Sequence, residues 1–297
     1  MRKLLNIILI YASFIQMRGQ IMWQFNKDTV ITWQYEWGDE FNESNIDPKQ
    51  WSYGVGGGLS IYTNKEQQYY TDGKNHVLEN GSYKIIAKRE SVEARTIDWL
   101  GDNDSLKQGR KFLHLNKKRF DFTSEKLESR RLFAGGFFEI RFKAPKDRGM
   151  WPAFWLYGGD PNEEIDIFEL KGEKPDQVHI DTHCPNRCDY FRRNLKKVNW
   201  GGWAKVSEGL HDGFNVMAVE WQPNYIKFYL NGRCIAYVPV SFKVERTLQV
   251  NLALPSDNGP FKPGPEPGFT QSTPFEVDYV RVWNMAEQNE GRPSGNY

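Results

Sequence analysis

Apolar and polar residues alternate in short runs along much of the chain, and these runs are rich in β-branched and aromatic residues. Such alternation is typical of β-strands, and Gly, Pro, Asn and Asp residues between the runs mark turns. The pattern predicts strands over 83–88, 136–143, 154–157, 164–170, 178–183, 214–221, 225–230, 247–254 and 275–283.

The same pattern excludes some architectures. No helical stripe of 12 or more residues is present, and strands do not alternate with helix-length amphipathic segments, which disfavours a parallel βαβ fold. We therefore expect an all-β, antiparallel sandwich. Asn231-Gly232 separates two strand-like runs and is the sequence signal of a type I′ hairpin between 225–230 and 233–238.

The first residues resemble a secretion signal. Arg2 and Lys3 precede an apolar run over 4–15, and Gly19 supplies a small residue near a cleavage point. The run of about 12 residues is shorter than the ~20 of a spanning helix. We expect a signal peptide over 1–20, a single domain over 21–297, a secreted or periplasmic protein, and no membrane insertion.

Charge and cysteine content narrow the function classes. The chain has 39 Lys and Arg and 38 Asp and Glu, so loss of Arg2, Lys3 and Arg18 leaves 36 − 38 = −2, which predicts no nucleic-acid partner. We expect a monomer. Three cysteines are too few for a disulfide scaffold. Cys184 and Cys188 could bridge a short loop, and Cys234, in a strand-like run, is expected to be a buried thiol.

The most informative feature is a row of acids inside a strand-forming run. Glu164 and Asp166 project from one face of a strand, whereas Glu169 would point to the other face. A β-bulge at Ile167-Phe168 would restore the phase and place all three carboxylates on one surface. A solvated acidic edge strand is the alternative interpretation of such a pattern.

Aromatic residues just before these acids favour a sugar-binding site. Aromatic residues make up 15% of the chain, although its mean hydropathy is only −0.68. Trp151 and Trp155 share a strand face and are expected to line the site, while Phe154 is expected in the core. Neighbouring carboxylates beside flat rings suit glycoside hydrolysis, and their closeness favours retention of configuration over inversion.

The acidic run resembles a known family. Glu164-Ile165-Asp166-Ile167-Phe168-Glu169 fits the E-x-D-x-x-E signature of family 16 glycoside hydrolases, the laminarinase, agarase, porphyranase and carrageenase group. Further segments that are similar to this family are 64–71, 136–145, Gly149 with 151–155, 220–221 with 226–232, and 278–283. The resemblance thus covers nearly all of the chain after residue 20.

The resemblance implies a concanavalin A-like jelly-roll β-sandwich of two antiparallel sheets with a concave substrate cleft. It implies that Glu164 is the nucleophile, Glu169 the general acid/base, and Asp166 the residue that holds and tunes the nucleophile. It also places His183 near the cleft and Asn64 and Glu66 in the substrate-binding set.

No cofactor is expected for catalysis, but the resemblance implies a structural calcium ion held by Glu40, Gly81 and Asp278, a mixture of oxygen donors that calcium accepts. A transition-metal site at His179, His183, Cys184 and Cys188 is rejected. On a strand, His179 and His183 would lie about 13 Å apart, too far to chelate one ion.

The family resemblance does not fix the polymer, and here basic residues guide the prediction. Lys and Arg are dense over 117–119, 130–131 and 187–197, and guanidinium groups suit sulfate oxygens. We expect the substrate to be an anionic, sulfated galactan (carrageenan, furcellaran or porphyran). Agarose, which is neutral, is a closely related candidate substrate. The alternatives are a laminarin-type β-1,3-glucan and a non-catalytic lectin. The candidate sulfate-binding residues are Arg130, Arg187, Arg192 and Arg193.

Overall fold

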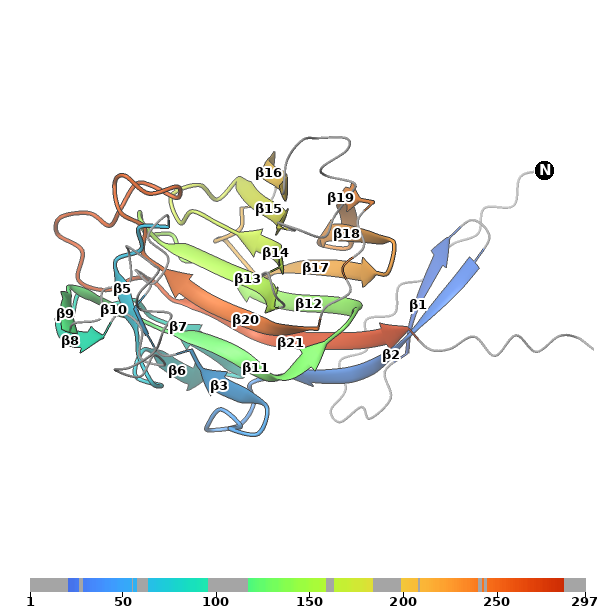
Figure 1. The fold of residues 1–297 in the computed structure, drawn as a ribbon, viewed down its shortest axis with the longest axis horizontal. Coiled ribbons are helices and arrows are strands. Elements are labelled where there is room, and N and C mark those ends of the chain that lie inside the picture. The colour runs from blue at the N-terminus through green and yellow to red at the C-terminus, as the bar shows by residue number, and fades with distance from the viewer. Residues whose placement is uncertain are drawn as a thin grey trace, which may run out of the picture.

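The computed structural model describes residues 21–26, 29–54, 56–57, 64–95, 117–158, 163–183, 199–207, 209–239, 242 and 245–285 (Figure 1). The described residues form strands and connecting turns, without a helix, so the all-β prediction is confirmed. No helix in this part of the chain is long and apolar enough to cross a membrane. The expected signal peptide over 1–20, Cys184, Cys188 and three of the candidate arginines lie outside the described residues.

One large sheet has nine strands in the order β1-β2-β21-β12-β17-β18-β19, with β7 paired to β21 and β6 paired to β7. Every pairing in it is antiparallel. Its strands are β1 (Ile21–Asn26), β2 (Thr29–Asp39), β6 (His76–Glu79), β7 (Ser82–Ile85), β12 (Gly136–Lys143), β17 (Asn215–Gln222), β18 (Tyr225–Leu230), β19 (Arg233–Val238) and β21 (Phe275–Met285).

The second large sheet has seven antiparallel strands in the order β16-β15-β14-β13-β20-β11-β3. They are β3 (Trp51–Tyr53), β11 (Lys126–Phe133), β13 (Trp151–Gly158), β14 (Glu163–Glu169), β15 (Gln177–His183), β16 (Asn199–Lys205) and β20 (Arg246–Ala253). Two small sheets complete the description, β10 (Phe122–Ser124) with β5 (Gln68–Tyr70) and β4 (Gly56–Gly57), and β8 (Val92–Arg95) with β9 (Lys117–Phe120).

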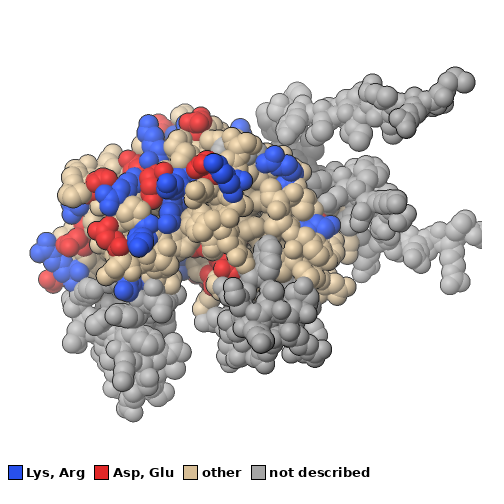
Figure 2. All heavy atoms as spheres, turned by 90° about the horizontal axis from the view of Figure 1, so that it is seen from above, with Lys and Arg blue, Asp and Glu red and all other residues tan. Residues whose placement is uncertain are grey.

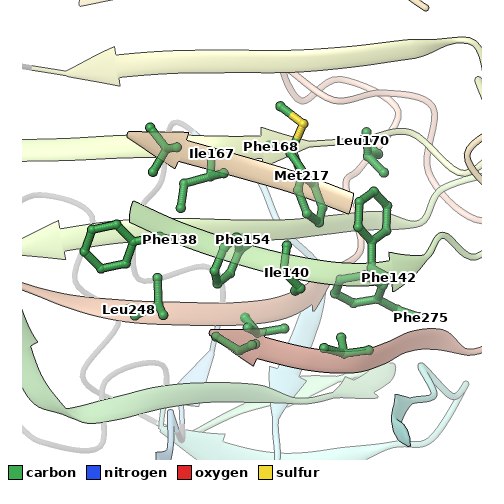
Figure 3. Close-up of a cluster of buried hydrophobic side chains, with 14 of the residues drawn as sticks. Phe138, Ile140, Phe142, Phe154, Ile167, Phe168, Leu170, Met217, Leu248 and Phe275 are labelled. Carbon is green, nitrogen blue, oxygen red and sulfur yellow. The ribbon is translucent and has the colours of Figure 1, made fainter. Parts of the chain in front are cut away.

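The core lies between the two large sheets. Alternate side chains of each sheet point inward and pack against the other sheet. Phe142 of β12 stacks on Phe168 of β14 with ring centroids 4.4 Å apart, and both are essentially inaccessible to solvent (Figure 3). Because one face of the seven-stranded sheet is committed to this core, its other face, called the outer face below, carries the residues left for function.

The predicted hairpin is confirmed. Asn231 and Gly232 connect β18 to β19, and both have positive φ, 48° and 77°, as a type I′ turn requires. The prediction for Cys234 is wrong, because its side chain is exposed. Cys234 lies on β19, the edge strand of the nine-stranded sheet, and faces away from the core.

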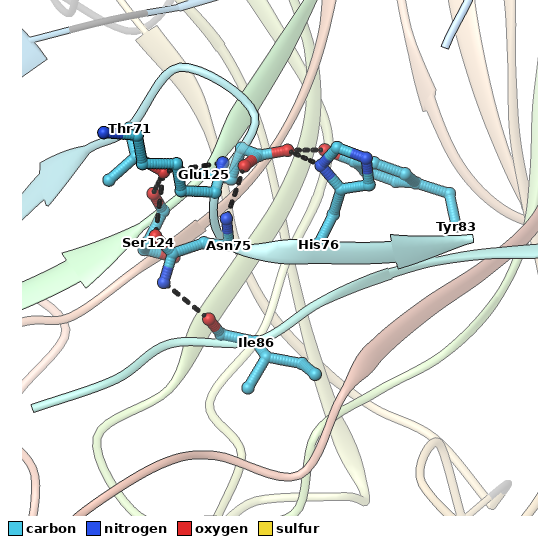
Figure 4. A network of polar contacts seen from close by, with 8 residues as sticks. Thr71, Asn75, His76, Tyr83, Ile86, Ser124 and Glu125 are labelled. Carbon is cyan, nitrogen blue, oxygen red and sulfur yellow. Dashed lines mark hydrogen bonds and ion pairs between the residues drawn. The ribbon is translucent and has the colours of Figure 1, made fainter. Parts of the chain in front are cut away.

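A buried polar network ties the segment before β6 to the start of β11 (Figure 4). The Glu125 carboxylate accepts hydrogen bonds from the Tyr83 hydroxyl at 2.6 Å and the Asn75 backbone N–H at 2.8 Å, and lies 2.6 Å from Nδ1 of His76. Thr71 donates to the Asn75 side chain at 2.8 Å. The network therefore fixes the chain that follows β5 against the end of the seven-stranded sheet.

Candidate active site

A β-bulge in β14 brings the acidic row onto one face. Phe154 of β13 pairs with Phe168, and the next residue, Trp155, pairs with Asp166, so Ile167 is the extra residue. Ile167 and Phe168 both point into the core. The bulge expected at Ile167-Phe168 is therefore confirmed.

As a result, Glu164, Asp166 and Glu169 all project from the outer face. The apolar residues between these acids point to the inner face. The three carboxylates therefore share one surface, as the expected glycoside hydrolysis requires. The alternative interpretation, a solvated acidic edge strand, is wrong because β14 lies inside the sheet between β13 and β15.

Glu164, Asp166 and His183 form a compact group. His183 pairs with Glu164 across β14 and β15, and its Nε2 lies 3.2 Å from Oδ2 of Asp166 and 3.7 Å from Oδ2 of Asp181. One ligand atom from each of Glu164, Asp166 and His183 lies within 4.8 Å of the others, the one such set of metal-ligating side chains in the described residues. Its two carboxylates are members of the acidic row.

Burial and mutual repulsion raise the pKa of both carboxyl groups. For Glu164 the pKa is raised well above its ordinary value, first by burial and then by the charge of Asp166, while His183 opposes the shift. The pKa of Asp166 is also raised, first by burial and then by the charge of Glu169. The pair therefore retains a proton to higher pH than an isolated carboxyl group would.

The opposite influences of Asp166 and His183 give a pH prediction. If Glu164 must be ionised for activity, the acid limb of kcat/KM lies above pH 4.5, the ordinary pKa of Glu. Asp166→Asn removes a negative neighbour and should move this limb to lower pH, whereas His183→Gln removes a positive neighbour and should move it to higher pH. Shifts in the same direction for both variants would contradict the assignment.

Both oxygens of Glu169 are engaged by neighbouring side chains. Trp151 donates from its indole Nε1 to Oε1 at 3.0 Å, and Nδ1 of His179 lies 2.9 Å from Oε2. Trp151 lies beside the acidic row, as the sequence predicts. However, Phe261 stacks on the Trp151 ring with ring centroids 4.0 Å apart, and only 6% of Trp151 is exposed. Trp151 thus holds the carboxyl group of Glu169, and its ring faces are not free for a sugar.

Sequence reasoning missed the contact between His179 and Glu169. It rejected His179 as a metal ligand because of its distance along the strand from His183, and β15 is indeed a strand. The contact arises across the strands, since Glu169 and His179 are register partners in β14 and β15. The sequence signal was only that the two predicted strands follow one another closely enough to pair, since the register that brings these two residues together depends on the connection between β14 and β15.

Trp155 is oriented by a chain of hydrogen bonds on the same face. Its indole Nε1 donates to Asn251 at 2.7 Å, Asn251 donates to the Tyr70 hydroxyl at 3.0 Å, and Tyr70 lies 3.4 Å from Oε2 of Glu66. The half-buried Trp155 is therefore fixed in orientation by residues from β20 and β5.

Asn64 and Glu66, which the family resemblance assigns to the substrate-binding set, lie at the end of this series of hydrogen bonds. Asn64 and Gln68 donate to the two carboxylate oxygens of Glu66 at 3.1 and 2.7 Å. Burial is the first cause of the raised pKa of Glu66. The structure thus brings Asn64 and Glu66 to the same end of the outer face as Trp155.

Arg130 is not beside the carboxylates. Its Nε donates to the backbone carbonyls of Pro48 and Trp51 at 2.5 and 3.1 Å. It belongs to β11, and β11 is separated from β14 by β20 and β13, three strand spacings or about 14 Å. Arg187, Arg192 and Arg193 lie outside the described residues.

The proposed calcium residues gather on the nine-stranded sheet. Asp39 pairs with Val280, and Tyr83 pairs with Val277, which brings Glu40 and Gly81 near Asp278. Here the Glu40 carboxylate pairs with Arg281 at 2.7 Å, and Asp278 pairs with Arg141 at 2.5 Å. Two carboxylates and a carbonyl suit calcium, which would have to compete with both arginines.

Comparison with known proteins decides the family. The model of the family described as glycosyl hydrolases family 16 matches residues 65–250, more than half of the chain. The chain belongs to this family. It is therefore an endo-acting glycosidase, and the family prediction is confirmed.

Relatives within family 16 differ in their named substrates. A glucan endo-1,3-beta-glucosidase of Cryptopygus antarcticus is 28% identical over 277 residues, which cover 84% of this chain and 92% of that protein. A keratan-sulfate endo-1,4-beta-galactosidase of Sphingobacterium multivorum is also 28% identical, over 88% of this chain and 51% of that protein. Further relatives are named as a beta-glucanase of Rhodothermus marinus and a glucan endo-1,3-beta-glucosidase of Niallia circulans.

A solved structure supports the fold. The laminarinase of Rhodothermus marinus matches 86% of this chain and 99% of its own with a TM-score of 0.64 at 28% identity. The jelly-roll sandwich predicted from the sequence is thus confirmed, whereas the names of the relatives leave the choice of a red-algal galactan without direct support.

Proposed function

We propose that this family 16 chain cleaves polysaccharides with retention of configuration. Glu164 attacks the anomeric carbon as the leaving oxygen takes a proton from Glu169, and Glu169 then deprotonates the water that releases the sugar from Glu164. The observation that carries this proposal is the shared outer face of the two glutamates, with Asp166 between them.

The stereochemical outcome tests this proposal. Proton NMR of the first reducing ends released from a β-linked polymer should show the β anomer before mutarotation. The α anomer as first product would mean inversion and would remove Glu164 from the nucleophile role.

For the polymer we propose a sulfated galactan, cleaved inside the chain at β-1,4-galactosidic bonds. Support comes from the keratan-sulfate galactosidase relative and from the basic run 187–197 of the sequence. The test is reducing-sugar release from κ-carrageenan, furcellaran, porphyran, keratan sulfate, agarose and laminarin, with the Glu164→Gln protein as blank. Activity on laminarin alone would overturn the galactan proposal.

A β-1,3-glucan is the second candidate, because several relatives are named as glucanases. The same panel decides between them. A non-catalytic lectin is disfavoured because the chain keeps both outer glutamates and their neighbours.

We also propose the structural calcium ion at Glu40, Gly81 and Asp278. A chelator should then lower the melting temperature, since a ligand at about 100 times its Kd contributes about 2.7 kcal/mol. Asp278→Asn should remove most of this chelator effect. An unchanged melting temperature in EDTA would contradict the calcium site.

We further propose that residues 1–20 direct export and are removed, which leaves one catalytic domain over 21–297. The intact mass of protein recovered from the periplasm or medium tests this. A mass that still includes residues 1–20 would contradict it.

A further inference from the structure

An aromatic cluster lies on the outer face beyond Glu169. Trp203 of β16 is 42% exposed, and its ring lies 5.1 Å from the ring of His179 and 5.4 Å from that of Phe261. Phe261 is buried against Trp151. Trp203 therefore presents a ring to solvent that is supported from below by other aromatic rings, the arrangement on which the C–H face of a sugar can stack.

The register places this ring on the Glu169 side of the acidic row. Glu169 pairs with His179, and His179 pairs with Trp203, so the three side chains form one line across β14, β15 and β16. Glu164 belongs to a different line, with His183 and Asn199. Because a general acid protonates the leaving oxygen, the sugar that departs lies on the side of Glu169.

The ammonium group of Lys171 lies over the ring of Trp203. Nζ of Lys171 lies 5.2 Å from the centre of the Trp203 ring and 5.9 Å from that of Phe261, and it donates to the backbone carbonyl of Lys262 at 2.9 Å. An ammonium group has three N–H donors, so two remain for another acceptor.

The charges near Lys171 are mostly positive. Lys174 and Lys262 act on it with the same sign and Glu173 with the opposite sign, and burial is the first cause of the lowered pKa of Lys171. Lys205, two residues after Trp203, lies 3.7 Å from Asp176. On the face that Figure 2 shows, basic and acidic side chains are interspersed.

We propose that Trp203 stacks against the sugar on the leaving-group side and that Lys171 binds an anionic substituent of that sugar. This inference rests on the proposed role of Glu169 as the general acid. It assigns the recognition of the anionic group to residues that the sequence did not single out, in place of Arg130. The substituent would be a sulfate ester or a carboxylate, which share oxygen acceptors for the ammonium group.

The stacking role of Trp203 is tested by changing the leaving group of the substrate. Trp203→Ala should lower kcat/KM on the polymer by about tenfold or more. It should leave within about twofold the release of fluoride from the β-glycosyl fluoride of the oligosaccharide that the wild type produces, because a single departing atom offers Trp203 no ring to stack on. Trp203→Phe should keep part of the polymer activity. Equal losses on both substrates would overturn the placement of Trp203.

The charge role is tested with a sulfated galactan and its desulfated form. Lys171→Met should lower the ratio of kcat/KM for sulfated over desulfated polymer by about tenfold, as expected for loss of a charge-assisted hydrogen bond. Lys49→Met, an exposed lysine near β3 at the opposite edge of the sheet, is the matched control and should leave the ratio unchanged. An unchanged ratio in Lys171→Met would overturn the binding of sulfate by Lys171.

These experiments separate this inference from the proposed function. A carboxylated polymer that depends on Lys171 while the sulfated polymer does not would assign the substituent to a carboxylate. If the wild type cleaved only neutral glucan, the sulfated-galactan proposal and the role of Lys171 would both fail. The comparison of polymer with glycosyl fluoride in Trp203→Ala would still test the stacking role on that glucan.

Discussion

Replacing Glu164 with Gln should lower turnover of the polymer by at least about 10⁴-fold, because an amide cannot form the glycosyl ester through which the reaction passes. The side chain is nearly isosteric, and the hydrogen-bonding groups around it remain. We expect the melting temperature to stay within a few degrees and calorimetry to detect oligosaccharide binding. Reducing-sugar release measures the activity.

Two controls make this result specific. Glu79→Gln changes an exposed glutamate of β6 on the other sheet and should leave turnover unchanged. Glu169→Ala should lose turnover of the polymer, but azide should restore turnover of an activated aryl glycoside and give a glycosyl azide of retained configuration. Wild-type activity in Glu164→Gln, or an azide product of inverted configuration from Glu169→Ala, would show that the roles are wrongly assigned.

The second large effect concerns stability. Glu163 lies one residue before Glu164 but points inward, where it pairs with Arg246, and the two side chains are 2% and 0% exposed. The guanidinium also lies 4.8 Å from the Trp221 ring centre and 4.5 Å from that of Phe242. Burial lowers the pKa of Arg246 to about 10, against the opposing effect of Glu163.

Removing one member of this pair leaves the other charge buried without its ion-pair partner. Glu163→Leu and Arg246→Met should each lower the free energy of unfolding by about 3–5 kcal/mol. Chemical denaturation monitored by tryptophan fluorescence measures the change.

The double variant is the informative control for this prediction. Glu163→Leu with Arg246→Met removes both charges from an apolar setting and should be more stable than either single change. If the effects of the two single changes simply added, the pair would not be coupled, and the large penalty would have to come from packing.

Several features of the fold could be predicted from the local sequence. The strands 136–143 and 225–230 were predicted at their observed bounds because apolar side chains alternate there without interruption. The type I′ turn was predicted because Asn-Gly tolerates positive φ at both positions. The bulge in β14 followed from a row of three acids that a regular strand would have split between two faces.

Other strands were not predicted because their apolar and polar residues do not alternate regularly. β11, with the sequence KLESRRLF, carries charges on its outer face and contains a register shift between Glu128 and Leu132 that breaks its alternation. β16, with the sequence NWGGWAK, is an edge strand with two glycines. For the same reason, Trp203 was not singled out as a site residue.

The sequence by itself determined the all-β class, the family and the order of the acidic residues along β14, since these depend on residue type and on spacing within one strand. The tertiary structure decided which residues from distant segments meet them: His179 and Trp151 at Glu169, Phe261 over Trp151, and Lys171 near Trp203. Such contacts depend on strand register and on loops that fold over a sheet, and alternation within a single strand carries no information on either.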